Sequence, residues 1–244
     1  MIGTNANANY FFACKIAFIF SEETDGDCGC PCFPFLGMNS KRDKFLNACY
    51  NGHINKVKSL LKDLKDLNAT NASGRTGFHL ACAQGHTEIV KLIIEESQIK
   101  NIALNKFDHD DRSGFHLACL YGQASVVDLL LKESQMKKIN IQSVNNRKRT
   151  GFHLACIAGE VQVVKLLLNE SRIDINAMDE KGRNGFQWAC QRGHFKLIQL
   201  FIQEHSHRIK IHAADNDGKN AYDMAIDYGH NEVAGLLSKH FNKS

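Results

Sequence analysis

A seven-residue motif that recurs almost unchanged constrains this chain more than any other feature. The sequence Thr-Gly-Phe-His-Leu-Ala-Cys occupies residues 76–82, and close copies occupy residues 113–119 and 150–156. Weaker copies lie at residues 184–190 and 220–226, and a degenerate one at residues 45–49. The cysteines of five copies are spaced 33, 37, 37 and 34 residues apart. A period of this length predicts a row of stacked helical pairs rather than one globular core.

Each of the five later copies carries the signals of a short helix that ends in a tight reversal. A residue suited to cap a helix N-terminus opens the copy, and a glycine follows nine positions later. The caps are Thr76, Ser113, Thr150, Asn184 and Asn220, and the glycines are Gly85, Gly122, Gly159, Gly193 and Gly229. A second apolar segment follows each glycine, as in residues 88–94 and 163–168. Its apolar face is too broad for one partner helix, so neighbouring copies are expected to bury it.

A turn with the pattern Asp/Asn-x-x-Gly-x-Thr/Asn precedes the capping residue at residues 71–76, 179–184 and 215–220. Glycine in this pattern supplies a positive φ angle. Asp111 and Lys148 replace it in the two middle copies. Aspartate tolerates the left-handed conformation, whereas Lys148 would cost about 1 kcal/mol there, so we expect a distorted or wider turn. The extra residues of the 37-residue copies fall between the second helix and the turn.

Each copy resembles an ankyrin repeat, whose signature Thr-Pro-Leu-His-x-Ala lies between a turn and two helices. Thr76, Phe78, His79, Leu80 and Ala81 match that signature. Glycine replaces the signature proline at positions 77, 114, 151 and 185. The resemblance covers residues from about 41 to 241. It implies an all-α ankyrin-repeat solenoid of about six stacked helix-turn-helix units, with projecting turns or short hairpins.

The expected domain organisation is a tail followed by the repeat array. Residues 1–40 lack the repeat, and residues 41–241 form the array. Its approximate units are residues 41–70, 71–107, 108–144, 145–178, 179–214 and 215–241. The first and last units have more polar helices, as terminal repeats require.

The tail is expected to be a poorly ordered, cysteine-containing leader. It contains Cys28, Cys30 and Cys32 at alternate positions. Lipid attachment and binding of a soft metal are the alternatives, because membrane-proximal cysteines accept palmitate and thiolates are good ligands. A zinc site normally draws four ligands from better-spaced pairs, and no second cysteine cluster stands nearby.

Composition and charge place the chain among intracellular proteins. The longest apolar run, Tyr10 to Phe20, is too short for a transmembrane helix. It contains Lys15 and has no basic residue before it, which makes it a poor signal peptide. We therefore expect a cytoplasmic location, with the nucleus as the alternative. The net charge is +4, and the first 40 residues carry one lysine against four acidic residues, so the remainder carries +7. That excess favours acidic partners.

The sequence contains no pattern that predicts catalysis, a cofactor or a metal site. Hydrolase, phosphate-binding and zinc-protease motifs are absent. Cysteines at equivalent positions of stacked helices would lie about 8 to 10 Å apart, too far for a disulfide, and are expected in the core. His79, His116 and His153 follow the caps, where the resemblance implies hydrogen bonds to the cap and turn. His205, His207 and His212 have no cysteine or carboxylate pair to complete a metal site.

The resemblance implies that a protein partner binds on the concave face, which the first helices and the turn tips form. The tip positions hold Arg75, Arg112, Arg147, Arg149, Lys181, Arg183 and Lys219. The helix positions expected to be exposed hold Tyr50, Leu120, Tyr121, Ile157, Gln191, Arg192 and Tyr228. Arginine and tyrosine commonly anchor interfaces. Asp110, Glu180 and Asp217 interrupt the basic stripe, so a preference for an acidic partner competes with an ordinary solvated face.

These observations favour a non-enzymatic, monomeric scaffold that binds a protein and requires no cofactor. The alternative is a targeting module of a larger enzyme or signalling protein. Direct binding of nucleic acid is disfavoured because the basic residues lack interleaved aromatic platforms. The resemblance also places Asn68, Asn105 and Asn176 at a position that asparaginyl hydroxylases modify in ankyrin proteins.

Overall fold

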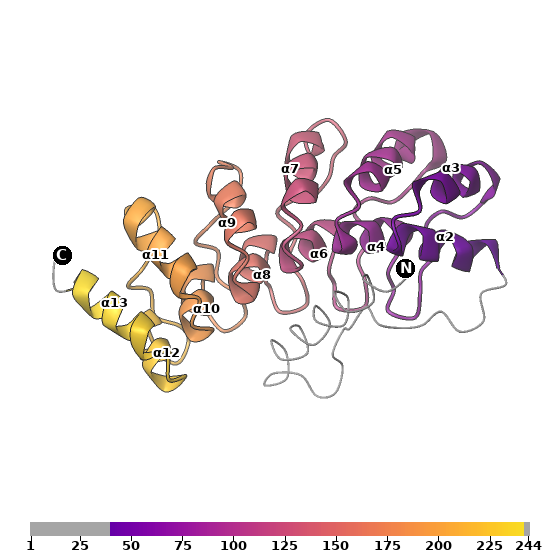
Figure 1. The fold of residues 1–244 in the computed structure, drawn as a ribbon. Helices are drawn as coiled ribbons and strands as arrows, with labels where there is room; N and C mark the ends of the chain where they lie inside the picture. Colours follow the sequence, from indigo (N-terminus) through magenta and orange to yellow (C-terminus); the bar gives the residue numbers. More distant parts are fainter. Residues whose placement is uncertain (1–39, 242–244) are drawn as a thin grey trace, which may run out of the picture.

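The computed structural model describes residues 40–241 and contains twelve α-helices in that range, arranged as six antiparallel pairs (Figure 1). The first helices of the pairs are α2 (Lys41–Tyr50), α4 (Gly77–Gln84), α6 (Gly114–Leu120), α8 (Gly151–Ala158), α10 (Gly185–Gln191) and α12 (Ala221–Asp227). The second helices are α3 (Ile54–Asp63), α5 (Thr87–Lys100), α7 (Ala124–Glu133), α9 (Val161–Leu168), α11 (Phe195–Glu204) and α13 (Asn231–Phe241). The expected all-α solenoid is confirmed.

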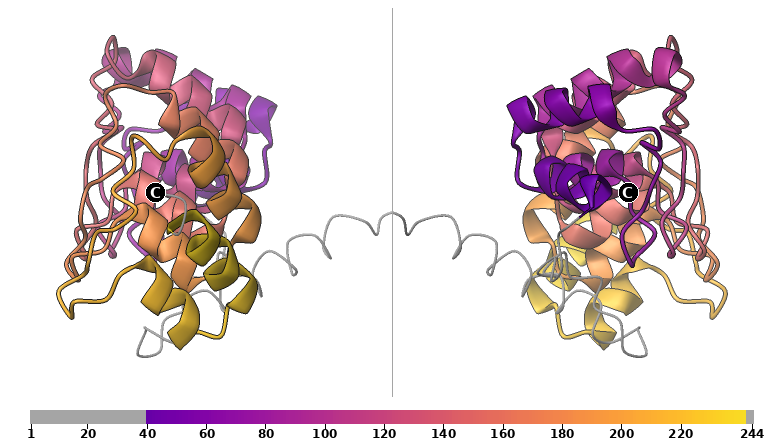
Figure 2. Two further views of the ribbon diagram at one scale, coloured as in Figure 1. Left: turned by 90° about the vertical axis from the view of Figure 1, so that its left-hand side faces the viewer. Right: turned by 90° about the vertical axis from the view of Figure 1, so that its right-hand side faces the viewer.

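The helices form two layers that run the length of the array. In Figure 1 the second helices make the upper row and the first helices the lower row. Each first helix packs against its own second helix and against the first helices of the neighbouring pairs. The turns before the first helices, which we call the finger turns, all project to the same side of the molecule (Figure 2). They comprise residues 71–75, 108–112, 145–149, 179–183 and 215–219.

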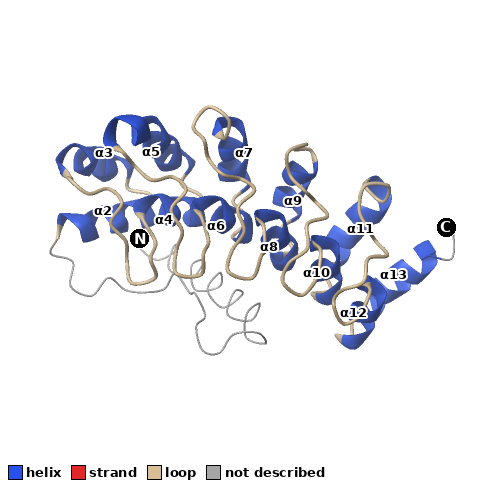
Figure 3. Cartoon of the chain, turned by 180° about the vertical axis from the view of Figure 1, so that it is seen from behind, coloured by secondary structure: helices blue, strands red, loops and turns tan. Residues whose placement is uncertain are grey.

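The finger turns contain no strand within residues 40–241, and loops alone connect the helices there (Figure 3). Each finger turn is closed by a backbone hydrogen bond from its first to its fifth residue, such as Asp179 N–H to Arg183 O at 3.0 Å. Neighbouring finger turns are also joined, for example by Glu180 N–H donating to Arg147 O at 3.1 Å. The cysteine-rich leader lies outside the described residues. No helix of the described part is long and apolar enough to span a bilayer.

The capping residues act as the sequence predicts. The Thr76 hydroxyl accepts from the His79 backbone N–H, and Ser113, Thr150, Asn184 and Asn220 cap their helices in the same way. Gly85 and Gly159 end their helices at φ angles of 77° and 74°, a conformation that glycine adopts without steric cost. The chain can therefore reverse at once into the second helix.

Glycine in place of the signature proline has a packing explanation. A Cβ atom added at Gly151 would lie 2.8 Å from Cε1 of Phe115 and 2.9 Å from Sγ of Cys119, both in the preceding first helix. Gly77, Gly114 and Gly185 face a phenylalanine and a cysteine of the preceding pair in the same way. The phenylalanine and cysteine of the first four copies thus fill space that the next copy leaves empty by using glycine, whereas the last copy has Ala221 at that position.

The expectation of a distorted turn at Lys148 is wrong. Lys148 adopts a left-handed φ of 56°, close to the 55° of Asp111. Its finger turn keeps the hydrogen bonds of a glycine-containing one: Lys148 N–H donates to Asn145 O at 2.9 Å, as Gly74 N–H donates to Asn71 O at 3.0 Å. The surrounding contacts outweigh a conformational cost of about 1 kcal/mol, so the lysine is accommodated without a change of turn.

Candidate interaction surface

The finger turns are held rigid by the side chain of their first residue. Asp179 Oδ1 accepts from the backbone N–H groups of Lys181 at 2.9 Å and Arg183 at 3.0 Å. Asn71 makes the equivalent bonds to Ser73 and Arg75. Because the first oxygen is used within the turn, the second oxygen of an aspartate is free to bond a side chain from elsewhere.

That second oxygen receives an arginine from the preceding finger turn. Arg75 Nε lies 3.1 Å from Asp108 Oδ2, and Arg183 Nε lies 2.9 Å from Asp215 Oδ2. Arg149 Nε makes the same contact with Asp179 at 3.3 Å. These ion pairs link residues 30 to 33 positions apart. They form a ladder that fixes successive finger turns relative to one another.

The ladder is interrupted at Arg112. The following finger turn begins with Asn145, which offers no carboxylate, and Arg112 instead turns back to Asp108 of its own finger turn, with Nε to Oδ2 at 3.1 Å. Asp108 therefore serves both Arg75 and Arg112. Burial acts to raise the pKa of Asp108, but the two guanidinium groups outweigh it and hold that pKa below its usual value.

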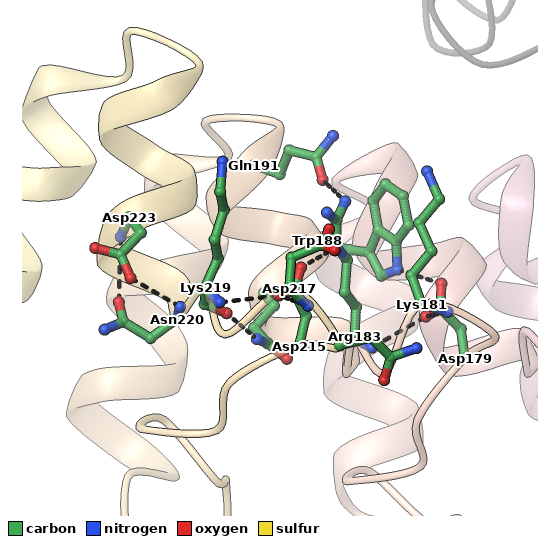
Figure 4. A network of polar contacts seen from close by, with 12 residues as sticks. Asp179, Lys181, Arg183, Trp188, Gln191, Asp215, Asp217, Lys219, Asn220 and Asp223 are labelled. Carbon is green, nitrogen blue, oxygen red and sulfur yellow. Dashed lines mark hydrogen bonds and ion pairs between the residues drawn. The ribbon is translucent and has the colours of Figure 1, made fainter.

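Trp188 is the centre of the most elaborate contact network (Figure 4). The guanidinium carbon of Arg149 lies 4.2 Å from its ring centroid and that of Arg183 lies 5.3 Å away. The indole Nε1–H donates to Asp179 Oδ2 at 2.9 Å, and Arg183 Nη1 donates to Gln191 Oε1 at 2.6 Å. Cation–π contacts and ion pairs thus place two buried arginines over one aromatic ring.

A second apolar cluster accompanies this network on the first helices, separate from the core between the two helix layers. We call it the concave cluster. It consists of Ala83, Leu117, Leu120, Tyr121, Leu154, Ile157, Ala158 and Trp188, each at most 5% exposed. Helices α6 and α8 therefore carry two buried faces. In α6, for example, the face with Phe115 and Cys119 belongs to the main core, and the face with Leu117 and Leu120 belongs to the concave cluster.

Eight residues that the sequence places at the turn tips or on the exposed side of the first helices are buried. The expectation that they are exposed is wrong. Their exposed fractions lie between 1% and 7%: Arg75, Arg112, Leu120, Tyr121, Arg149, Ile157, Arg183 and Gln191. The arginines are buried because the ladder and Trp188 engage them, and the others because the concave cluster and Arg183 do. Tyr50, Arg147 and Arg192 are half-buried, whereas Lys181, Lys219 and Tyr228 are exposed.

Three apolar residues that were not predicted to contact a partner are exposed in the structure. Phe107, Val144 and Met178 are 41%, 45% and 40% exposed. Each immediately precedes the first residue of a finger turn, so they occupy equivalent positions in three consecutive repeats. Their shared position relative to Asp108, Asn145 and Asp179 was the available signal. Together they add an exposed apolar row beside the finger turns.

The histidines after the caps are structural, as predicted. Nδ1 of His79 accepts from the Thr76 backbone N–H at 3.2 Å, so Nε2 carries the proton and donates to Arg112 O at 3.1 Å. Burial lowers the pKa of His79 to about 4 and that of His116 to about 4. The rings of His79 and His116 remain neutral at physiological pH, and His79 and His153 connect their caps to the next finger turn through Nε2.

The repeat cysteines belong to the core, as predicted. All five are buried, and burial raises the pKa of each thiol. Within residues 40–241 no group of three or more histidine, cysteine and carboxylate side chains is arranged to hold a metal ion. Asn68, Asn105 and Asn176 each bridge to the backbone of the next repeat, as in Asn68 Nδ2 donating to Asn101 O at 2.9 Å. Their hydroxylation stays a prediction.

Comparison with known proteins gives one family and one informative relative. The sequence model described as "Ankyrin repeats (3 copies)" matches residues 45–143, 98–179, 134–211 and 152–244, which together cover residues 45–244. Among the curated proteins that match is the 26S proteasome non-ATPase regulatory subunit 10 of Rattus norvegicus, 40% identical over 50 residues. The matched segment is 20% of this chain and 22% of that protein, well under two thirds of its length.

Proposed function

This chain belongs to the ankyrin-repeat family, whose repeats are a protein-interaction module that is generally non-enzymatic, and we propose that it binds a protein partner through its central concave face. The side chains available on that face are the exposed row of Phe107, Val144 and Met178 and the basic finger residues Arg147 and Lys181, while the buried concave cluster supports the helices that carry them. The chain acts by presenting these side chains rigidly, as a monomer without a cofactor, in the cytoplasm or nucleus.

The observation that carries the proposal is the combination of a rigid frame with exposed apolar positions. The arginine–aspartate ladder and the hydrogen bonds between finger turns leave the frame little conformational freedom to lose on binding, which favours affinity. Apolar residues recur at equivalent exposed positions of three consecutive repeats. Such a row, flanked by charged residues, is typical of an interface.

The preference for an acidic partner rests on fewer residues than the sequence suggests. Arg75, Arg149 and Arg183 are paired with aspartates, and their charge is largely neutralised. Lys181 and Lys219 remain exposed, and Arg147 is half-buried. We therefore propose that apolar contacts provide most of the affinity, while the basic finger residues steer an acidic partner and make association dependent on salt.

Affinity capture from lysate with matched variants tests this function. Met178→Asp/Val144→Asp is expected to remove the specific partner, and Arg147→Glu/Lys181→Glu is expected to reduce its capture in a salt-dependent manner. The control, Lys91→Glu/Lys165→Glu, makes the same change of charge on exposed positions of the second helices α5 and α9. Equal loss in the control, or unchanged capture by both the apolar and the basic variant, would contradict the proposal.

The alternative is that the array targets a larger assembly or enzyme. The rat relative is by name a non-ATPase regulatory subunit of the 26S proteasome, which is itself a larger assembly. Size-exclusion chromatography of cell lysate distinguishes the two cases. A targeting module would elute together with an enzymatic activity, and the variant Met178→Asp/Val144→Asp would elute separately from that activity.

A further inference from the structure

The boundary between the repeat of α6 and α7 and the repeat of α8 and α9, which we call the central boundary, differs from the others on the finger side. Three of the four pairs of neighbouring finger turns share a backbone hydrogen bond. The donors and acceptors are His109 N–H to Ser73 O at 3.1 Å, Glu180 N–H to Arg147 O at 3.1 Å and Asn216 N–H to Lys181 O at 3.0 Å. Among the described residues, the finger turns of residues 108–112 and 145–149 share no such bond. The ladder pair is missing at the same place, because Asn145 replaces the aspartate.

A buried side-chain link is also missing at the central boundary. His79 and His153 each donate from Nε2 to the backbone oxygen of the fifth residue of the next finger turn, at 3.1 Å. His116 is the equivalent residue at the central boundary. Its Nδ1 accepts from the Ser113 backbone N–H, so Nε2 carries the proton, yet Nε2 is buried without a hydrogen-bond partner. A buried donor of this kind weakens the boundary instead of strengthening it.

The residue after the reversal glycine shows the same break in the pattern. At four boundaries it bonds a backbone oxygen of the preceding repeat. These bonds join His86 Nε2 to Tyr50 O at 2.9 Å, Gln123 Nε2 to Ala83 O at 3.0 Å, His194 Nε2 to Ile157 O at 2.8 Å and His230 Nε2 to Gln191 O at 2.9 Å. Glu160 holds this position at the central boundary. A carboxylate accepts hydrogen bonds but has no proton to donate to a backbone oxygen.

The other side of the central boundary is closed. Arg172 donates from Nη1 to Ser134 Oγ at 2.7 Å and from Nη2 to Leu131 O at 3.0 Å, at the C-terminal end of α7. Gln142 Nε2 donates to Arg172 O at 2.7 Å. Helices α6 and α8 pack against each other, as do α7 and α9. In Figure 1 the end of α7 lies at the top of its repeat and the finger turns lie at the bottom. A boundary that is held on one side and unjoined on the other has the arrangement of a hinge.

We infer that the central boundary is a hinge, at which the block of α2 to α7 and the block of α8 to α13 open on the finger side about the Arg172 contacts. Each repeat of a solenoid contacts only its neighbours, so one weak boundary divides the array. The rigid frame then consists of these two blocks. The consequence for a partner rests on the proposed function: Phe107 lies on one block and Val144 and Met178 on the other, so the hinge sets the spacing of the exposed row, and a partner that contacts both blocks fixes the hinge angle.

Distances between spin labels, measured by pulsed electron paramagnetic resonance on the full chain, test the hinge without a partner. The labels are attached at the exposed second residues of the finger turns. The pair Ala72→Cys/Asn146→Cys spans the central boundary, and the matched pair Asn146→Cys/Asn216→Cys spans the same number of finger turns without it. The first pair is expected to give the broader distance distribution. So that only introduced thiols are labelled, serine replaces Cys14, Cys28, Cys30 and Cys32.

A closing substitution sharpens the test. Asn145→Asp/Glu160→His supplies the missing carboxylate and the missing donor, and is expected to narrow the first distribution to the width of the second. The control Asn71→Asp adds the same charge at the first described finger turn, where no preceding ladder arginine can meet it, and is expected to change neither width.

Two results would overturn the inference. One is equal widths for the two label pairs before any closing substitution. The other is a first distribution that stays broad in Asn145→Asp/Glu160→His, or that Asn71→Asp narrows to the same extent. Because these distances are measured without a partner, a failure of the capture experiment leaves them unaffected, and the hinge and the proposed function can fail separately.

Discussion

The central and the C-terminal repeats share one backbone arrangement, but their first helices differ in how much of their surface is buried. All eight residues of α8 are buried, whereas α12 buries only Ala221, Met224 and Ala225. At the position of the buried Ile157 the last repeat has the exposed Asp227, and its neighbours Ile226 and Tyr228 are 47% and 45% exposed. Helix α12 also lacks a following first helix within the described residues, so less of it is covered.

The difference shows that the repeat plan alone does not make an interaction surface. Caps, turn glycines and core positions are shared by both regions, and these are sufficient for stacking. The apolar concave face, the buried arginines and the histidine caps are confined to the central repeats and the adjoining α10. We therefore expect substitutions at equivalent positions to have large effects in the centre and small ones at the C-terminal end.

The largest contrast concerns the residue three positions after the cap, which is a histidine in the central repeats, Gln187 in α10 and Asp223 in α12. Burial lowers the pKa of His79 and His116 to about 4, so the unfolded chain binds more protons between pH 6.5 and 4. Stability is therefore complete above about pH 6.5 and falls as the pH approaches 4, by up to about 3 kcal/mol for each histidine. Urea unfolding at several pH values measures this loss.

Gln187 suggests a control substitution, because glutamine can keep the hydrogen bond to the capping residue and does not titrate. Its Oε1 accepts from the Asn184 N–H at 3.0 Å, as His79 Nδ1 accepts from Thr76. The variant His79→Gln/His116→Gln/His153→Gln should flatten the pH dependence between pH 6.5 and 4. A slope equal to that of the wild-type chain would contradict the assignment of acid sensitivity to these rings.

The next contrast compares two basic residues at the fifth position of a finger turn. Arg183→Ala leaves the buried Asp215 carboxylate without its partner and should cost about 3 to 5 kcal/mol. Lys219→Ala removes an ion pair with Asp227 in which both side chains are more than 40% exposed, and should cost at most about 1 kcal/mol. Thermal unfolding of both variants measures the difference, and equal destabilisation would contradict the burial-dependent ladder.

A smaller contrast, with opposite signs, compares two glycines. Gly151→Ala would bring a methyl group within 3 Å of Phe115 and Cys119 and should destabilise the array by about 1 to 3 kcal/mol. Gly235→Ala, in α13, meets no atom within 4 Å and should stabilise by about 0.5 to 1 kcal/mol through helix propensity. The midpoints of urea unfolding check both, and a stabilising Gly151→Ala would refute the proposed packing of phenylalanine and cysteine against glycine.

The smallest contrast exchanges residues between two finger turns. Lys148→Gly should stabilise by about 1 kcal/mol, because Lys148 holds a left-handed φ of 56°. Gly218→Lys, at a φ of 77° with no atom within 4 Å of an added Cβ, should destabilise by about the same amount. If neither change alters the unfolding midpoint, the backbone conformation of these turns carries no cost.

Local features of the fold were predictable from the sequence, because caps such as Thr76 and reversals such as Gly85 depend on neighbours within a few positions. The burial of Arg149 and Arg183 was not predicted, because it depends on whether the next finger turn begins with an aspartate 30 or more residues away. Asp179 and Asp215 were visible in the sequence, but only the stacked arrangement shows that the preceding arginines reach them.

The outcome at Lys148 shows a different limit. A conformational preference of about 1 kcal/mol is smaller than the contacts that define a finger turn, so the propensity of one residue could not decide its geometry. The row of Phe107, Val144 and Met178 was missed for the opposite reason. The sequence reasoning searched for charged and aromatic anchors at the tips, while these apolar residues lie one position before the turn.

The most direct test of a buried concave face in the central repeats is the rate at which introduced thiols are labelled in the native chain. Leu120→Cys and Ile157→Cys should be labelled slowly, like the native core cysteines, whereas Ile226→Cys should be labelled rapidly, with peptide mass spectrometry locating each modification. Rapid labelling at 120 and 157, at the rate found at 226, would contradict the account.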